Sequence, residues 1–169
     1  AGAAKLSFSS VKQNTIELLL QKKKSQALRE IIFFIKHNPD LKNLDETNDF
    51  LVMVAQKFIF REAQEAYENS INLSLENIKE AIKSNEKCLK IEPQQLECLI
   101  QKTRLLYRAK DRAGVNETIT KIKEIVPRTK YDKWLNLILI KDKIEFNNKQ
   151  IIRNLKDKNP EEWNGLILL

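Results

Sequence analysis

The sequence predicts an all-α fold, a short right-handed α-solenoid of about four helical hairpins. Only 3 Gly and 4 Pro occur in 169 residues, and Leu, Ile, Lys, Glu, Asn and Gln dominate, which favours helices over sheets. The segments Ile78–Pro93 and Arg112–Pro127 end alike, in Ile, any residue and Pro. The spacing from Pro93 to Pro127 recurs almost unchanged from Pro127 to Pro160. Such a period in a helical chain indicates hairpins that stack on one another.

The first hairpin is predicted over residues 9–39. Apolar residues with helical spacing begin at Val11, and Ser9 or Ser10 is placed to cap the helix. Ser25 is expected to cap the second helix. This helix should stop before Asn38-Pro39, because a proline disfavours helical geometry at the residue before it.

The second hairpin is predicted over residues 48–93, and it is longer than the others, because the interval from Pro39 to Pro93 well exceeds the period. The surplus predicts either one extended helix over 48–73 or an extra helix with a break near Phe60. We favour the extended helix, since no Gly or Pro marks a break. Ser74 is then expected to cap the following helix, which runs to about Lys90.

The third hairpin is predicted over residues 96–127, with its turn at Lys110-Asp111. The inner face of its second helix is expected to consist of Val115, Ile119, Ile122 and either Ile125 or Val126. A fourth hairpin is predicted over 130–160. The apolar tail 161–169 is expected to cover the last hairpin, and the alternative is that it exposes a partner surface or begins a further repeat.

The segment Ile78–Pro93 resembles the second helix of a tetratricopeptide repeat. Glu80-Ala81-Ile82 and Lys87-Cys88-Leu89, then Ile91 and Pro93, stand at the family's places, with Cys88 in place of its small Ala. The resemblance covers about two thirds of the chain and is most specific over 78–127. It implies that the first helix of each hairpin lines a concave groove, which binds an extended or helical peptide.

The resemblance also implies which residues line that groove. Arg104 and Arg108 share one helix face at the i, i+4 spacing and could hold a carboxylate together. Tyr107 and Trp134 could act as aromatic anchors. A core position for Trp134 and solvated arginines are the alternatives that remain open. The full set of candidate partner-binding residues is Lys12, Arg61, Gln64, Arg104, Tyr107, Arg108, Tyr131, Trp134 and Lys141.

The sequence does not predict an enzyme, a cofactor or a metal site. The single histidine, His37, lies beside a predicted helix end, where a cationic cap explains it, and three glycines cannot build a phosphate-binding loop. Cys88 and Cys98 form neither a disulfide framework nor a zinc site, so a buried, inert thiol is expected at Cys88. The acidic stripe Glu62, Glu65 and Glu68 is interpreted as a solvated helix face.

The net charge of +7 would attract anionic partners. A solvated, lysine-rich surface is the alternative explanation of this charge, and it is favoured over a dedicated polyanion site. The resemblance implies a bacterial-type adaptor that binds a protein segment, acidic or amphipathic in character. A basic helical nucleic-acid binder ranks behind it, because no dense arginine cluster occurs. A secretion chaperone or assembly subunit is a further alternative. We expect no membrane span, and a monomer or a weak homodimer through the apolar tail. A cytoplasmic location is slightly favoured, and export stays open if a signal peptide was removed.

Overall fold

A computed structural model describes residues 7–38 and 44–125 of the chain. This part contains seven α-helices and no strand, which confirms the all-helical class. The helices are α1 (Phe8–Leu20), α2 (Lys24–His37), α3 (Leu44–Gln56), α4 (Arg61–Leu73), α5 (Ile78–Ile91), α6 (Leu96–Arg108) and α7 (Arg112–Ile125). None of them is both long and apolar enough to cross a membrane. The predicted hairpin 130–160 and the tail 161–169 lie outside the described residues.

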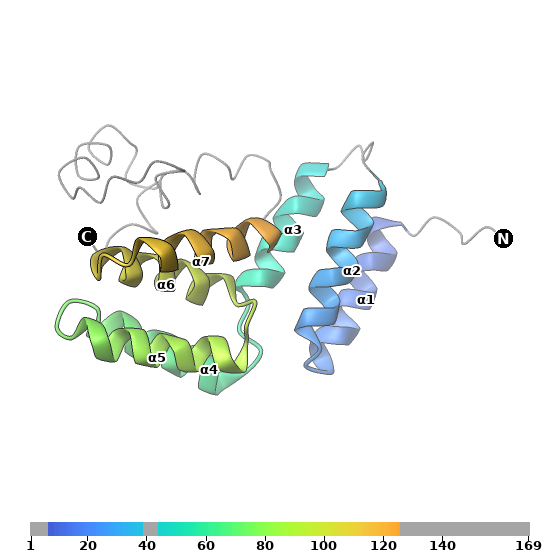
Figure 1. The fold of residues 1–169 in the computed structure, drawn as a ribbon. Coiled ribbons are helices and arrows are strands. Elements are labelled where there is room, and N and C mark those ends of the chain that lie inside the picture. The colour runs from blue at the N-terminus through green and yellow to red at the C-terminus, as the bar shows by residue number, and fades with distance from the viewer. Residues whose placement is uncertain (1–6, 39–43, 126–169) are drawn as a thin grey trace.

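Three helical hairpins and one single helix make up the described fold (Figure 1). The hairpins are α1/α2, α4/α5 and α6/α7, and the most extensive helix contact is that of α4 with α5. Helix α3 has no hairpin partner and packs against α2 and α6. In Figure 1, α1, α2 and α3 run steeply, whereas α4 to α7 run across the view. The direction of the helices therefore changes between α3 and α4.

The prediction of one long helix over 48–73 is wrong. Helix α3 ends at Gln56 and α4 begins at Arg61, and Phe60 is extended, with φ −109° and ψ 127°. The predicted hairpin 48–93 therefore consists of α3 followed by the hairpin α4/α5. The physical reason is not local, because side chains from distant parts of the chain bind the backbone groups at the break.

Three of the predicted helix caps are also wrong. Ser7 rather than Ser9 or Ser10 caps α1, and its hydroxyl accepts a bond of 3.1 Å from the Ser10 amide. Helix α2 already begins at Lys24, so Ser25 lies inside it, and the cap position, Lys23, makes no side-chain cap bond.

Ser74 ends α4 instead of starting α5. Its buried hydroxyl donates to the Ile71 carbonyl at 2.7 Å. Asn77 caps α5, where its side chain accepts from the Glu80 amide at 3.2 Å. Other predicted boundaries are confirmed, since α2 stops at His37 and the turn between α6 and α7 holds Lys110-Asp111.

The buried apolar residues form two clusters. The larger cluster joins α1, α2, α3, α6 and α7, and it includes the predicted inner face of α7, Val115, Ile119, Ile122 and Ile125. The smaller cluster joins α4, α5 and α6 around Ala63, Ala66, Cys88 and Cys98. Helix α6 contributes to both clusters, so it connects the α4/α5 hairpin to the rest of the fold.

Gly114 lies in the first turn of α7, close to the side chains of Asp111 and Leu106. A Cβ atom there would lie 2.6 Å from Asp111 Oδ2 and 2.8 Å from Leu106 Cδ1. Asp111 caps the helix, because its carboxylate accepts from the Gly114 amide at 2.9 Å. We expect Gly114→Ala to lower the free energy of unfolding by about 1 kcal/mol, because the new Cβ displaces both the Asp111 cap and the Leu106 side chain, and these two losses together outweigh the higher helix propensity of Ala.

Urea unfolding followed by circular dichroism measures this effect. Asp111→Ala is the matched control, since it removes the cap without adding a Cβ at residue 114. Stabilisation by Gly114→Ala would contradict the crowding.

Candidate interaction site

The predicted concave lining is only partly described, and its described members lie on three helices, α1, α4 and α6. Lys12 on α1 pairs with Glu46 on α3 at 3.9 Å. Arg61 and Gln64 are exposed on α4, where each bonds the residue four positions later in the same helix. Tyr131, Trp134 and Lys141 lie outside the described residues.

The predicted arginine pair is engaged in contacts inside the protein. Arg108 donates to the carbonyl of Ser74 at the end of α4. Arg104 donates to Gln101 Oε1 at 3.3 Å, and Gln101 in turn donates to Ser70 Oγ on α4 at 3.3 Å. Burial lowers the pKa of the Arg104 guanidinium, and nearby Tyr67 and Glu97 partly offset this effect. The two arginines therefore belong to a polar seam between α6 and α4.

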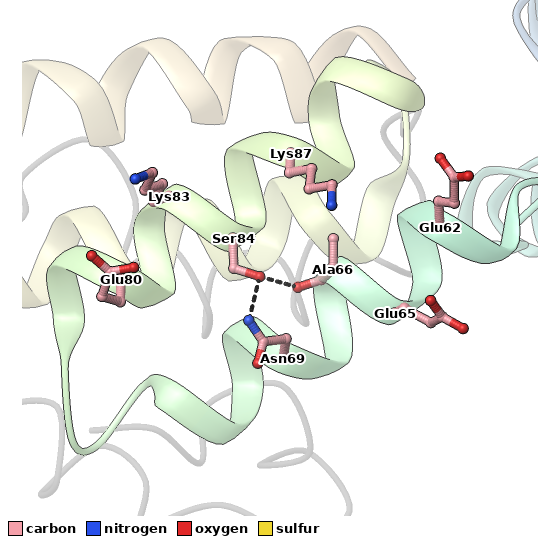
Figure 2. Close-up of a pocket in the computed structure, with 8 residues that line it drawn as sticks. All are labelled: Glu62, Glu65, Ala66, Asn69, Glu80, Lys83, Ser84 and Lys87. Carbon is pink, nitrogen blue, oxygen red and sulfur yellow. Dashed lines mark hydrogen bonds between the residues drawn. The ribbon is translucent and has the colours of Figure 1, made fainter.

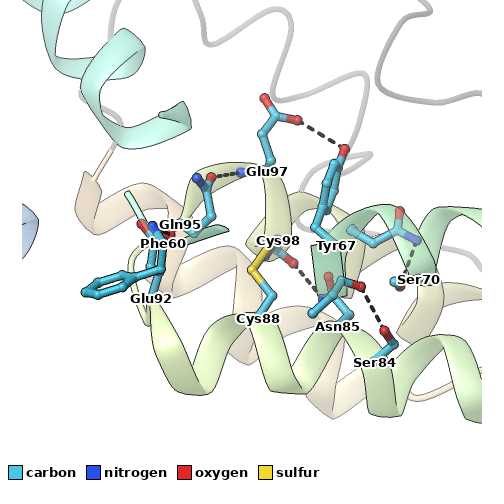
Figure 3. Close-up of a disulfide and its surroundings, with 12 residues drawn as sticks. Phe60, Tyr67, Ser70, Ser84, Asn85, Cys88, Glu92, Gln95, Glu97 and Cys98 are labelled. Atoms are coloured by element: carbon cyan, nitrogen blue, oxygen red, sulfur yellow. Dashed lines mark hydrogen bonds between the residues drawn. A yellow bond between two sulfur atoms is a disulfide. The ribbon is translucent and has the colours of Figure 1, made fainter. Parts of the chain in front are cut away.

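Two more side chains complete this seam. The Tyr67 hydroxyl of α4 donates to Glu97 Oε2 of α6 at 3.4 Å, as Figure 3 shows. Burial raises the pKa of Tyr67, and the negative charge of Glu97 adds to this rise. Tyr107, another predicted anchor, is only 8% exposed and packs in the larger cluster. The residues predicted on α6 thus hold helices together.

A buried ion pair stabilises the break between α3 and α4. The ammonium group of Lys24, at the start of α2, donates to the carbonyls of Ala55 at 3.0 Å and Lys57 at 2.6 Å. It also contacts Glu92 Oε1 at 3.4 Å. The ammonium thus has three acceptors for its three N–H groups. Two of these acceptors are carbonyls that the ending helix leaves without an intrahelical partner.

Glu92 binds the backbone amides on the α4 side of the same break. Its carboxylate accepts from the amides of Ile59 at 3.1 Å and Phe60 at 3.2 Å. The side chains of Lys24 and Glu92 are only 8% and 4% exposed. Burial lowers the pKa of Lys24, and Glu92 partly offsets this effect. We call Lys24, Glu92 and the backbone of 55–60 the break cluster, and its role is structural.

An open groove lies between α4 and α5, with a volume of about 450 Å³ (Figure 2). We call it the α4–α5 groove. On its floor the Ser84 hydroxyl donates to the Ala66 carbonyl at 2.8 Å and accepts from Asn69 Nδ2 at 2.9 Å. These bonds fix the spacing of the two helices. The full lining is Glu62, Glu65, Ala66 and Asn69 from α4, and Glu80, Lys83, Ser84 and Lys87 from α5.

The walls of the α4–α5 groove carry opposite net charges. Helix α4 presents Glu62 and Glu65, and α5 presents Lys83 and Lys87 together with one carboxylate, Glu80. Among the described residues, no ion pair of 4.0 Å or less joins these two walls, and Glu65 instead pairs with Arg61 in its own helix at 3.1 Å. Charges of both signs are therefore available to a ligand.

Comparison with known proteins adds no relative. No family model, no curated protein and no solved structure matches the chain. The resemblance of 78–93 to a tetratricopeptide repeat therefore stays a prediction.

Sequence reasoning missed the α4–α5 groove, although one of its signals was visible. The acidic stripe on α4 is exposed, in keeping with its interpretation as a solvated face, but two of its members, Glu62 and Glu65, also line one wall of the groove. The second signal is the i, i+4 spacing of Lys83 and Lys87 on α5. The two signals combine only through the register between α4 and α5, which places the four side chains around one groove.

The expectation of an inert thiol at Cys88 is wrong. Cys88 and Cys98 form a disulfide that links α5 to α6, with a Cα–Cα distance of 6.6 Å (Figure 3). The side-chain amide of Asn85 donates to the Cys98 carbonyl at 2.8 Å, which joins the same two helices. The predicted burial of Cys88 is confirmed, whereas its bond to Cys98 is a feature that the sequence analysis does not contain.

Proposed function

We propose that this chain is a protein-interaction scaffold, which binds a segment of another protein in the α4–α5 groove. The observation that carries the proposal is the pair of walls with opposite net charge, which face the same open groove without pairing with each other. A surface of this kind offers charge and shape to a ligand. The proposal therefore concerns binding, and no catalytic step is part of it.

The walls indicate the chemistry of the partner segment. Basic side chains would face Glu62 and Glu65, and acidic side chains would face Lys83 and Lys87. The expected partner is therefore an amphipathic segment with both signs of charge, rather than a purely acidic one. A uniformly charged chain would meet repulsion from one wall, and such repulsion is a source of specificity.

Exposed charge pairs contribute about 0.2–1 kcal/mol each, so we expect weak, salt-sensitive binding. Three short peptides of equal length test this directly, one with alternating Glu and Lys, one with Lys only and one with Glu only. In NMR titrations at low salt, the mixed peptide should shift the Asn69 and Ser84 amide signals most strongly. Equal or stronger effects from a uniformly charged peptide would contradict the proposal.

Charge reversal of the basic wall tests the residues themselves. Lys83→Glu/Lys87→Glu should weaken binding of the mixed peptide about tenfold, because two attractive pairs become repulsive. Lys79→Glu/Lys90→Glu is the matched control, since it makes the same change on positions of α5 outside the groove.

A swap of the two walls adds a rescue experiment. Adding Glu62→Lys/Glu65→Lys to the reversed variant exchanges the charges and should restore affinity for the mixed peptide, which carries both signs. An equal loss in the control variant, or no rescue by the swap, would show that the peptide binds elsewhere.

A further inference from the structure

The disulfide lies at the closed centre of the junction between α4, α5 and α6. Both cysteines are 0% exposed. Ala63 and Ala66 of α4 belong to the same buried cluster, and Phe58, Phe60 and Tyr67 are among the residues packed against it. Helix α4 and the break before it therefore cover the bond from one side. The sulfur atoms have no path to solvent while these elements are in place.

Burial of this degree controls the chemistry of the bond. Reduction of a disulfide requires a thiolate to attack one of its sulfur atoms, and formation by exchange requires one of the cysteines to attack an oxidant. Neither step can occur at a sulfur atom that an attacking group cannot reach. The oxidation state can therefore change only when the junction opens.

We propose that Cys88–Cys98 is a folding-locked disulfide, which forms before the junction closes and which the folded domain then protects from reductants. In the forming step, the two thiols lose two protons and two electrons, and one S–S bond forms. A protein or small-molecule disulfide accepts the electrons, and its own S–S bond becomes two thiols. The folded domain thus preserves the redox state in which it folded.

The position of the disulfide in the fold supports a structural role for the bond. The connection from α5 to α6 contains Glu92 of the break cluster and Gln95, whose side chain donates to the Gln56 carbonyl at the end of α3 at 3.0 Å. The disulfide closes a loop of sequence separation 10 around this connection. The disulfide therefore restrains the connection from which the side chains of Glu92 and Gln95 bind the backbone at the α3–α4 break.

The compartment follows from the same inference. Disulfides of this structural kind form and persist where protein thiols are oxidised, and they are rare in a reducing cytosol. We infer that the chain folds in an oxidising compartment. The disulfide is not part of the α4–α5 groove, so the oxidising compartment does not depend on binding there.

Reduction kinetics test the lock. The purified, oxidised protein is treated with dithiothreitol in native buffer and in denaturing urea, and free thiols are trapped by alkylation and counted by mass. We expect reduction of the native protein to be at least about 100-fold slower, and to accelerate with urea as unfolding does. Similar reduction rates in both solutions would overturn the lock. So would a reduction rate of the native protein that does not change with urea below the unfolding transition.

Oxidation supplies the converse test. Protein reduced and refolded around free thiols should stay reduced when glutathione disulfide is added in native buffer, whereas protein refolded with the same oxidant should form the bond. Equally fast oxidation of the folded protein would contradict the lock.

Acid trapping of the chain from its own cells tests the compartment. A fully oxidised chain is expected, and a chain with free thiols would overturn that part of the inference.

Discussion

Glu92→Ala should lower the free energy of unfolding by about 3–5 kcal/mol, the range for a buried ion pair that loses one partner. The substitution leaves the ammonium of Lys24 buried without its counter-ion. It also leaves the amides of Ile59 and Phe60 without the carboxylate that accepts from them. Each buried donor without a partner adds a desolvation cost.

Urea unfolding followed by circular dichroism measures this loss. Glu65→Ala is the matched control, since it removes an exposed ion pair with Arg61 and should cost no more than about 0.5 kcal/mol. Glu92→Gln should fall between the two, because the amide keeps an acceptor and loses the charge. A loss for Glu92→Ala as small as that of the control would show that the break does not depend on this carboxylate.

The second large effect is expected from the disulfide. Cys88→Ala/Cys98→Ala should lower the free energy of unfolding by about 3 kcal/mol, because the unfolded chain regains the entropy of a short closed loop. The sequence separation of 10 sets the size of this loop. The alanines also leave a small void in the cluster with Ala63 and Ala66, which adds to the loss.

Thermal unfolding without reductant measures the effect of the double variant. Wild-type protein that has been unfolded, reduced and refolded is the matched comparison, since it lacks the bond and keeps both sulfur atoms. It should unfold near the temperature of the variant. If both were as stable as the oxidised protein, the bond would not contribute to stability.

Much of the helical pattern could be predicted from local sequence, and the α3–α4 break could not. Helices α6 and α7 follow from apolar spacing and from the Lys110-Asp111 turn. The segment 57–60 contains no Gly or Pro, so no local signal marks the end of α3 before it. Its backbone is held from far along the chain, because Lys24 binds the carbonyl of Lys57 and Glu92 binds the amide of Ile59.

The candidate site could be predicted even less well, for a related reason. Arg104 and Arg108 share a helix face, as their spacing indicates, but that face packs on α4 rather than opening to a ligand. The α4–α5 groove requires the register between two helices, which a one-helix pattern does not contain. The disulfide requires the corner after Pro93, which returns Cys98 to Cys88.

The break cluster is central to this account, because it separates α3 from α4 at the point where the direction of the helices changes. Amide hydrogen exchange at Ile59 and Phe60 tests it most directly. Both amides lie outside every helix of the described residues, yet both donate to Glu92. They should exchange slowly in the wild-type protein and much faster in Glu92→Ala, which removes the acceptor. Exchange at the rate of an unprotected peptide in the wild-type protein would contradict the account.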